Sequence, residues 1–345
     1  MVDFKDTALG EEITFETFGC KVFDADPETP DRLQPDKTIY REGAEKLDLM
    51  APDGKKIRVW TFADTSPGAQ LRDEPLTYPA PLMRVTQGQV VHTRLTSSTG
   101  PHTIHHHGIE PSTFNDGVGH VSFEVGDSYT YQWQPSRTGT FFYHCHRNTT
   151  LHFELGMFGG LIVDPPDEGD GQKRIYTGGP VYDSEKFWVV DDMDPRWHLI
   201  GDHDAGLCGM DVGLNRFEPE YFLLSGVFNN RTEEDTRAVV EAQPGERVLI
   251  RLLNASYSRL EVRFACDVTI VESDGHMWGK EPWCPNTVLV PAGERIEMVP
   301  AQRYGLMLTT QGVGDIPVEM KFRHWITGKV QHDGAGRLNT RIKVR

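Results

Sequence analysis

Short runs in which hydrophobic and polar residues alternate recur along the chain, and they place the strongest limit on its fold. Examples are KKIRVWTFAD (55–64), SYTYQWQP (128–135) and GTFFYHCH (139–146), which are bounded by Gly, Pro, Asp or Asn. A period of two is typical of β-strands, whereas helical periodicity is scarce here. The 34 Gly and 22 Pro favour the turns that end such strands. Together these features predict an all-β fold of packed sandwiches.

A boundary is predicted in the segment VDPPDEGDGQKR (163–174), which follows a predicted strand and is rich in Pro, Gly and charge. On either side of it, TQGQVVHTRL (86–95) and QPGERVLIRL (243–252) each place a Gly turn before an alternating strand. We therefore expect two β domains, residues 1–170 and 171–345, of ordinary domain size. Residues 1–44 are acidic and less regular, and we expect them to form an arm or an added edge.

The charge balance limits the possible partners. The net charge is −16 at pH 7, which argues against nucleic acid because phosphate binding needs a basic face. No run approaches the roughly 18 apolar residues of a membrane span, so we expect no membrane partner. The first residues lack the basic segment and apolar core of a secretory signal. We therefore expect a cytoplasmic protein, or a periplasmic one if the sequence is already processed.

Eight of the fourteen histidines lie between residues 102 and 152, mainly in HTIHHHG (102–108) and YHCHRNTTLH (143–152). Side chains alternate between the two faces of a strand. His144 and His146 should therefore share one face while Cys145 points the other way. His106 should point away from its neighbours and belong to the core. The opposite face can then present a four-imidazole surface, called here the outer patch, which consists of His105, His107, His144 and His146.

Cys145 should point into its own sandwich, where further ligand types are available. His102 lies upstream, and His152 and Met157 lie downstream in LHFELGM (151–157). Two imidazoles, a thiolate and a thioether form the ligand set of a blue copper site. Zinc also accepts Cys and His, but a Met ligand suits it poorly. Because Cys145 lies between His144 and His146, the backbone would connect this copper to a second site by a short path for electrons.

These motifs resemble those of multicopper oxidases. HTIHHHG, the following NDG (115–117) and YHCHRNTTLHFELGMFGGLIV (143–163) are similar to the family elements H-x-x-H-x-H-G and H-C-H with a later His and Gly-Met. The resemblance implies two cupredoxin-like Greek-key β-sandwich domains and copper as the cofactor. It assigns the type 1 blue site to His102, Cys145, His152 and Met157, a type 2 ligand to His105, and type 3 ligands to His107, His144 and His146.

Asp116 falls where laccases and copper efflux oxidases of this family carry an acidic residue that assists proton delivery. The resemblance therefore implies a catalytic role for Asp116. The NDG sequence is also a good turn signal, and the two roles are compatible.

The chain departs from the family pattern in two ways. The spacing from Cys145 to His152 is longer than usual and closer to that of copper nitrite reductases. A full trinuclear centre takes eight histidines from four H-x-H motifs, whereas this chain has two such motifs, both in the first domain. An outer site with one or two copper ions is therefore expected.

His324, in KFRHWITG (321–328), occupies a predicted strand like the one that supplies a type 2 ligand in copper nitrite reductases. Two-domain members of the family form trimers in which the first domain of one chain faces the second domain of the next. The resemblance therefore implies a homotrimer, with His324 of the partner subunit as a candidate ligand of the outer site.

The leading functional hypothesis is a laccase-like copper oxidoreductase. The type 1 copper would accept electrons from a small-molecule or metal-ion donor and pass them through Cys145, His144 and His146 to a histidine-ligated copper site that reduces dioxygen. One alternative is a nitrite reductase-like enzyme with type 1 and type 2 copper. Another is a non-catalytic blue-copper electron carrier or copper-binding protein. The identity of the donor is not encoded in any motif of the sequence.

Overall fold

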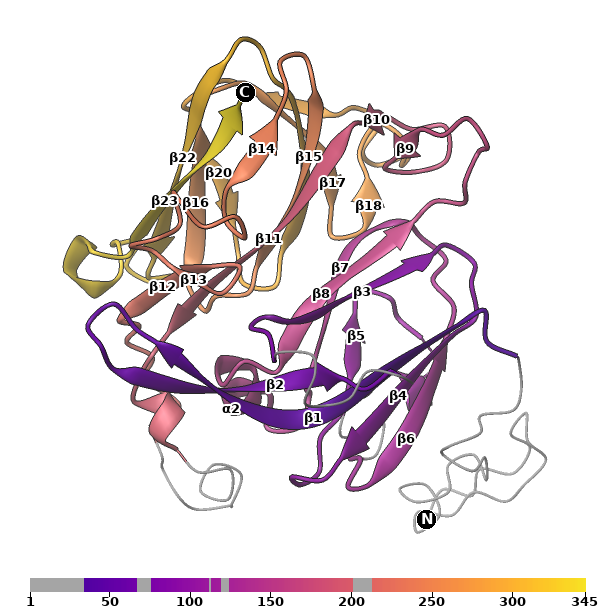
Figure 1. The fold of residues 1–345 in the computed structure, drawn as a ribbon, viewed down its shortest axis with the longest axis vertical. Helices are drawn as coiled ribbons and strands as arrows, with labels where there is room; N and C mark the ends of the chain where they lie inside the picture. The colour runs from indigo at the N-terminus through magenta and orange to yellow at the C-terminus, as the bar shows by residue number, and fades with distance from the viewer. Residues whose placement is uncertain (1–33, 67–75, 112, 119–123, 201–212) are drawn as a thin grey trace.

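The computed structural model describes residues 34–66, 76–111, 113–118, 124–200 and 213–345. In these ranges the chain forms four larger β-sheets and one two-stranded sheet, with only short helical segments. The larger sheets make up two sandwiches, one from each half of the chain (Figure 1). The predicted all-β class is confirmed.

The first sandwich pairs two four-stranded sheets. The sheet of order β2-β1-β4-β6 contains β1 (Lys37–Met50), β2 (Lys56–Asp64), β4 (Val91–Ser97) and β6 (Ser128–Trp133). The sheet of order β3-β8-β7-β5 contains β3 (Ala80–Thr86), β5 (His105–His107), β7 (Gly139–His144) and β8 (Phe158–Asp164). Two short helical segments interrupt the strands, η1 (Thr113–Asn115) and α2 (Thr149–Glu154).

The second sandwich follows a small hairpin of β9 (Lys173–Arg174) and β10 (Val181–Tyr182). Its larger sheet contains β11 (Ser184–Met193), β12 (Tyr221–Leu224), β13 (Val227–Phe228), β15 (Arg247–Asn254), β17 (Val268–Ser273), β18 (His276–Met277), β19 (Val288–Val290) and β21 (Arg303–Thr309). Its smaller sheet contains β14 (Val240–Ala242), β16 (Arg259–Phe264), β20 (Ile296–Met298), β22 (Gly314–Arg323) and β23 (Arg337–Val344). Two 3-10 turns complete it, η2 (Trp197–Leu199) and η3 (His332–Gly334).

The expectation that residues 1–44 form an arm or an added edge is wrong for residues 37–44. These residues begin β1, which lies between β2 and β4 and is therefore an inner strand. The sequence pattern does not reveal this strand, because two of its buried positions are occupied by the charged residues Arg41 and Glu42. Arg41 forms an ion pair with Asp64 at 3.2 Å and donates from Nε to the hydroxyl of Tyr143 at 3.2 Å. Buried charges of this kind are tolerated only when they are paired. Residues 1–33 lie outside the described ranges.

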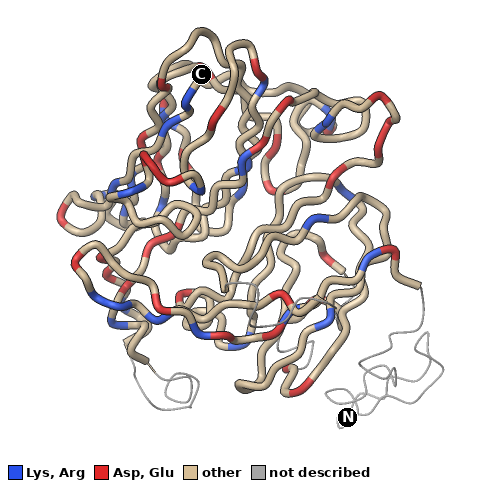
Figure 2. The backbone as a smooth tube through the Cα atoms, viewed as in Figure 1, with Lys and Arg blue, Asp and Glu red and all other residues tan. Residues whose placement is uncertain are grey.

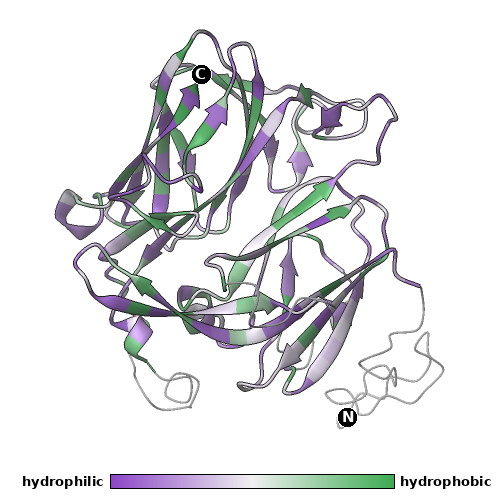
Figure 3. Cartoon of the chain, in the orientation of Figure 1, coloured by the Kyte–Doolittle hydropathy of each residue, from purple (hydrophilic) through white to green (hydrophobic). Residues whose placement is uncertain are grey.

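Alternating hydropathy explains how the sandwiches close. Along most strands hydrophobic and hydrophilic residues succeed one another (Figure 3), and β23 shows the pattern clearly because every second residue is buried. β7 is different, since all six of its residues are buried. Phe141 and Tyr143 pack into the core of the first sandwich, whereas Phe142 belongs to a cluster shared with residues of the second sandwich. One face of β7 is therefore turned toward the second sandwich.

Polar contacts also join the two sandwiches. Glu272 of β17 accepts hydrogen bonds from the backbone N–H and the hydroxyl of Thr140 on β7. Arg251 of β15 donates to the same hydroxyl at 3.0 Å and lies 3.6 Å from the Glu272 carboxylate. Both charged side chains are fully buried. This network anchors β7 against the second sandwich.

Among the described residues, Lys and Arg lie interspersed with Asp and Glu over both sandwiches (Figure 2). No helix in the ranges that the structure describes is long and apolar enough to cross a membrane.

Candidate metal centre

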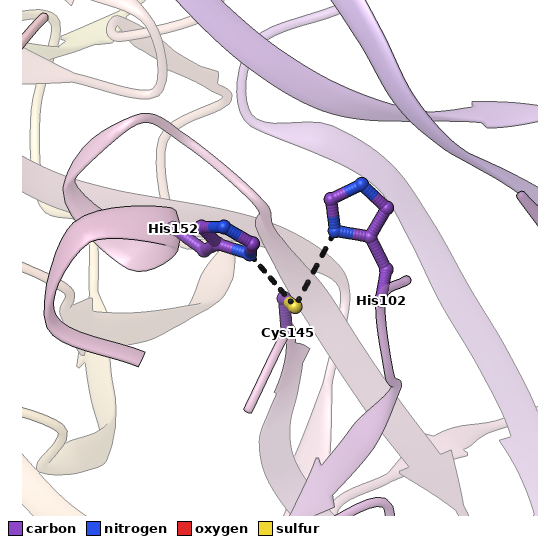
Figure 4. A group of neighbouring side chains, drawn as sticks. All are labelled: His102, Cys145 and His152. Carbon is purple, nitrogen blue, oxygen red and sulfur yellow. Dashed lines mark hydrogen bonds between the residues drawn. The ribbon is translucent and has the colours of Figure 1, made fainter. Parts of the chain in front are cut away.

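Strand register places the two histidine motifs side by side. β5 pairs antiparallel with β7, so that His105 lies opposite His144 and His107 lies opposite Phe142. β7 continues into Cys145, whose backbone N–H donates to the carbonyl oxygen of Met157 at 3.0 Å. The chain after Cys145 turns into α2, and this short helix places His152 beside the cysteine (Figure 4).

His102, Cys145 and His152 form a buried trio, called here the inner group (Figure 4). The Cys145 sulfur lies 3.3 Å from Nδ1 of His152 and 3.8 Å from Nδ1 of His102. Ligands bound at roughly 2.0–2.3 Å to one ion are themselves separated by about 3–4 Å, so these distances fit a shared metal. The structure thus brings these three predicted residues together.

Burial makes the thiolate form of Cys145 dependent on a nearby cation. Burial raises the pKa of the Cys145 thiol to about 11, although hydrogen bonds from Thr103 and Arg147 lower it. A thiolate is the form that binds metal, and it needs a compensating positive charge in a buried setting. A copper ion held there by Cys145, His102 and His152 would supply that charge. The residues of the inner group therefore fit the metal that the sequence predicts.

Met157 is brought beside the inner group. It is fully buried and belongs to the same core cluster as Cys145. Its backbone N–H donates to the carbonyl oxygen of His152 at 3.0 Å, which fixes the turn that carries both residues. Its role as an axial ligand stays a prediction.

The outer patch lies on the opposite face, as strand alternation predicts. His105, His107 and His144 offer ligand nitrogens that all lie within 4.8 Å of one another. His146 extends the patch, since its ring centroid is 5.3 Å from that of His105 and 5.7 Å from that of His144. The structure therefore gathers the predicted residues, and three of them could hold one metal ion.

Hydrogen bonds fix the tautomer of His144. Its Nδ1 donates to the carbonyl oxygen of Cys145 at 2.9 Å, which leaves Nε2 as the ligand atom, 3.2 Å from Nδ1 of His107. Burial, and then the charge of Arg303, lower the pKa of His107 to about 3. Burial lowers the pKa of His144 well below its usual value. Both rings are therefore neutral at pH 7, which is the state that binds a metal.

Asp116 contacts the outer patch directly. Nδ1 of His105 donates to the backbone oxygen of Asp116 at 2.7 Å, and the Asp116 carboxylate lies 3.2 Å from the same nitrogen. This is the arrangement by which a carboxylate or carbonyl orients a metal-binding imidazole. The turn requires Gly117, because φ is +71° there and a Cβ would collide with the Ile104 carbonyl. The proton-delivery role of Asp116 stays a prediction.

His106 is a core residue, as its position in the strand predicts. Its Nε2 lies 3.0 Å from the hydroxyl of Thr93, and its ring packs 4.7 Å from that of Trp133. Burial lowers the pKa of His106 to about 3.

This pKa gives a testable pH dependence. As pH falls below about 6.5, the unfolded chain protonates this histidine but the folded chain does not until about pH 3. The metal-free protein should therefore lose stability relative to a His106→Gln variant by up to about 1.4 kcal/mol per pH unit in this window. Urea unfolding across the window measures the difference. His332→Gln, at an exposed position, is the control, and a pH-independent difference for His106→Gln would contradict the expectation.

A cavity of about 570 Å³ opens over His105 and His107, and the second sandwich forms part of its wall. Among the lining residues that the sequence did not link to the site are Arg137, Asp274, His276 and Arg303. Nη1 of Arg137 donates to His276 at 2.9 Å across the interface. His276 follows the turn at Asp274 and Gly275 and also lines this cavity. No short-range pattern could have identified these residues, because the interface brings them together.

His324 lies elsewhere in this chain. Its Nδ1 accepts hydrogen bonds from the backbone N–H groups of Ile326 and Thr327, both at 3.2 Å. It lines a different cavity of about 740 Å³, which also includes Thr150 of α2 and Tyr257. It does not join the outer patch of its own chain. A contribution to the outer site of a partner subunit stays a prediction.

Comparison with known proteins agrees with this geometry. A sequence profile described as "Multicopper oxidase" matches residues 76–168, which span both histidine motifs. An L-ascorbate oxidase of Cucumis sativus is 34% identical over 262 residues, covering 68% of this chain and 40% of the relative. The chain belongs to the multicopper oxidase family. The cofactor of this family is copper, which the donor sets described above fit.

Solved structures place this multicopper oxidase among cupredoxin-type folds. A multicopper oxidase named mgLAC aligns with a TM-score of 0.65 at 21% identity, covering 89% of this chain and 86% of that one. A blue copper oxidase from Nitrosomonas europaea aligns with a TM-score of 0.63 at 22% identity, covering 89% and 85%. The chain spans less than half the length of the curated L-ascorbate oxidases that it matches.

Proposed function

We propose that the protein is a copper oxidase that takes electrons from a small-molecule or metal-ion reductant and reduces dioxygen. The observation that carries this proposal is the position of two ligand groups on opposite faces of one strand end. Cys145 belongs to the inner group and His144 to the outer patch, and one peptide bond joins them. A simple electron carrier would need only the inner group. The relatives named L-ascorbate oxidase support an oxidase in preference to a carrier.

The residues of the inner group and of the outer patch have different roles. Bound copper would supply one-electron redox chemistry at the inner group and dioxygen binding at the outer patch. His102, Cys145 and His152 hold the inner site in a buried, apolar setting that excludes water. The hydrogen bond from His144 to the Cys145 carbonyl adds a second connection beside the covalent path between the groups. Asp116 orients His105 and presents a carboxylate that can hold a proton at the cavity.

The oligomer belongs to the same proposal. We infer a homotrimer in which His324 of the partner subunit approaches the outer patch. His324 supports this by position, because it lies near the end of β22, next to the exposed side chains of Trp325 and Ile326. Exposed apolar side chains of this size commonly mark protein interfaces.

Metal quantitation on the copper-loaded protein, with absorption and paramagnetic resonance spectra, tests the proposal. From the available ligands we expect about two or three copper ions per chain, one of them a type 1 ion with an intense thiolate absorption. Oxygen uptake with a phenolic donor should exceed nitrite turnover with the same donor. A type 1 signal alone, without oxygen uptake, would leave an electron carrier. The solution mass of the same preparation tests the trimer.

A further inference from the structure

Arg303 reaches from the second sandwich to the strand that carries the outer patch. It is the first residue of β21, and its side chain is 5% exposed. Nε donates to the carbonyl oxygen of Thr140 on β7 at 3.2 Å, and Nη1 donates to that of Ala301 at 2.9 Å. Asp274 pairs with Nη1 at 3.0 Å. The Arg303 guanidinium therefore has hydrogen-bond and ion-pair partners on both sides of the interface between the sandwiches.

The guanidinium lies against the aromatic residues behind the patch. Its central carbon is 5.5 Å from the ring centroid of Phe142, within the range of a cation–π contact. The Phe142 ring in turn stacks on His107, with centroids 4.2 Å apart and planes inclined by 24°. It also stacks on His144 at 5.3 Å and 23°. One aromatic ring thus connects Arg303 to two imidazoles of the outer patch.

Gly108 provides the space for this arrangement. A Cβ at Gly108 would lie 2.7 Å from Nη2 of Arg303, and φ of +87° already disfavours other residues there. The glycine follows His107 directly in the motif HTIHHHG. The end of this motif is therefore shaped to admit an arginine from the second sandwich.

We propose that Arg303 is a positioning residue for the outer metal site, which holds Phe142 and thereby keeps His107 and His144 in the orientation where their ligand nitrogens converge. This inference rests on the proposed function only in that the outer patch binds copper. The second sandwich, which lacks H-x-H motifs, then contributes rigidity to the site. A lysine cannot replace this role, because it lacks the planar guanidinium that both stacks and donates several fixed hydrogen bonds.

The test is titration of the metal-free, full-length protein with Cu(II), comparing wild type with Arg303→Lys. Residues that orient metal ligands commonly change affinity by about 10–100-fold. We expect Arg303→Lys to weaken Cu(II) binding at the outer site by at least about tenfold and to change the paramagnetic hyperfine signal of that copper. Cu(II) affinity and thiolate absorption at the inner group should stay unchanged.

Arg251→Lys is the matched control. Arg251 is a fully buried arginine at the same interface and donates to Thr140, but its partners are Glu185 and Glu272. It should lower stability without selective loss at the outer site. Phe142→Leu should reproduce the effect of Arg303→Lys, and the double variant should show little additional loss, because both act through one contact.

The outcomes separate this inference from the proposed function. Equal weakening of both sites by Arg303→Lys, or the same change in Arg251→Lys, would overturn the positioning role. If Arg303→Lys does not fold, an unchanged outer site in Phe142→Leu would overturn it as well. If the wild type binds copper at the outer patch but does not consume oxygen, the proposed function fails and the positioning role is still decided by the titration.

Discussion

Replacing Cys145 with Ser is expected to remove the thiolate absorption of the copper-loaded protein and to reduce oxygen uptake by more than about 100-fold. Substitution of residues that only orient metal ligands commonly lowers metal affinity or activity by about 10–100-fold. Cys145 is itself a candidate ligand, so its replacement should lower activity by more than this. Its sulfur lies at the centre of the inner group, 3.3 and 3.8 Å from two imidazole nitrogens. A serine hydroxyl is a much harder donor and does not give the thiolate that copper prefers. Absorption spectra and oxygen uptake measure the two effects.

The outer patch should keep its copper in this variant. His105, His107 and His144 converge without any contribution from the sulfur. Paramagnetic resonance should therefore show outer-site copper while the type 1 signal is absent. Cys266→Ser is the control, because Cys266 is a half-buried free thiol of the second sandwich. A Cys145→Ser variant that kept its oxygen uptake would exclude the inner group as the entry point for electrons.

Most of the site could be predicted because it depends on local rules. Side chains alternate along a strand, so the order His144, Cys145, His146 alone predicts that sulfur and imidazoles lie on opposite faces. The structure agrees, with Cys145 in the core and His144 on the face of the outer patch. The same rule predicted that His106 is a core residue.

The remainder depends on contacts between residues far apart in the chain. Strand β1 escaped prediction because Arg41 is charged, and partners that include Asp64 and Tyr143 make its burial acceptable. Arg303 lies in PAQRYG (300–305), a stretch without any metal-ligand type, and its relation to His107 exists only through the packing of β7 on the second sandwich. Interdomain packing is set by the complementary shape of two surfaces, which one sequence does not display.

Glu272→Ala is expected to destabilise the protein by about 3–5 kcal/mol, because it removes the fully buried one of the two carboxylates, Glu272 and Glu185, that pair with the buried Arg251. Glu272 and Arg251 have fully buried side chains, and the carboxylate also accepts two hydrogen bonds from Thr140. Removing the carboxylate costs the Coulombic pairing and leaves buried donors unsatisfied. Nη2 of Arg251 is already a buried donor without a hydrogen bond, so little compensation is available. Urea unfolding of the metal-free protein measures the loss.

Glu319→Ala is the matched surface control. Glu319 of β22 pairs with Lys321 at 2.8 Å and Arg337 at 3.3 Å, but its side chain is 38% exposed. Exposed pairs of this kind contribute about 0–1 kcal/mol, so its removal should have little effect. Similar losses in the two variants would show that the interface network carries no special stability.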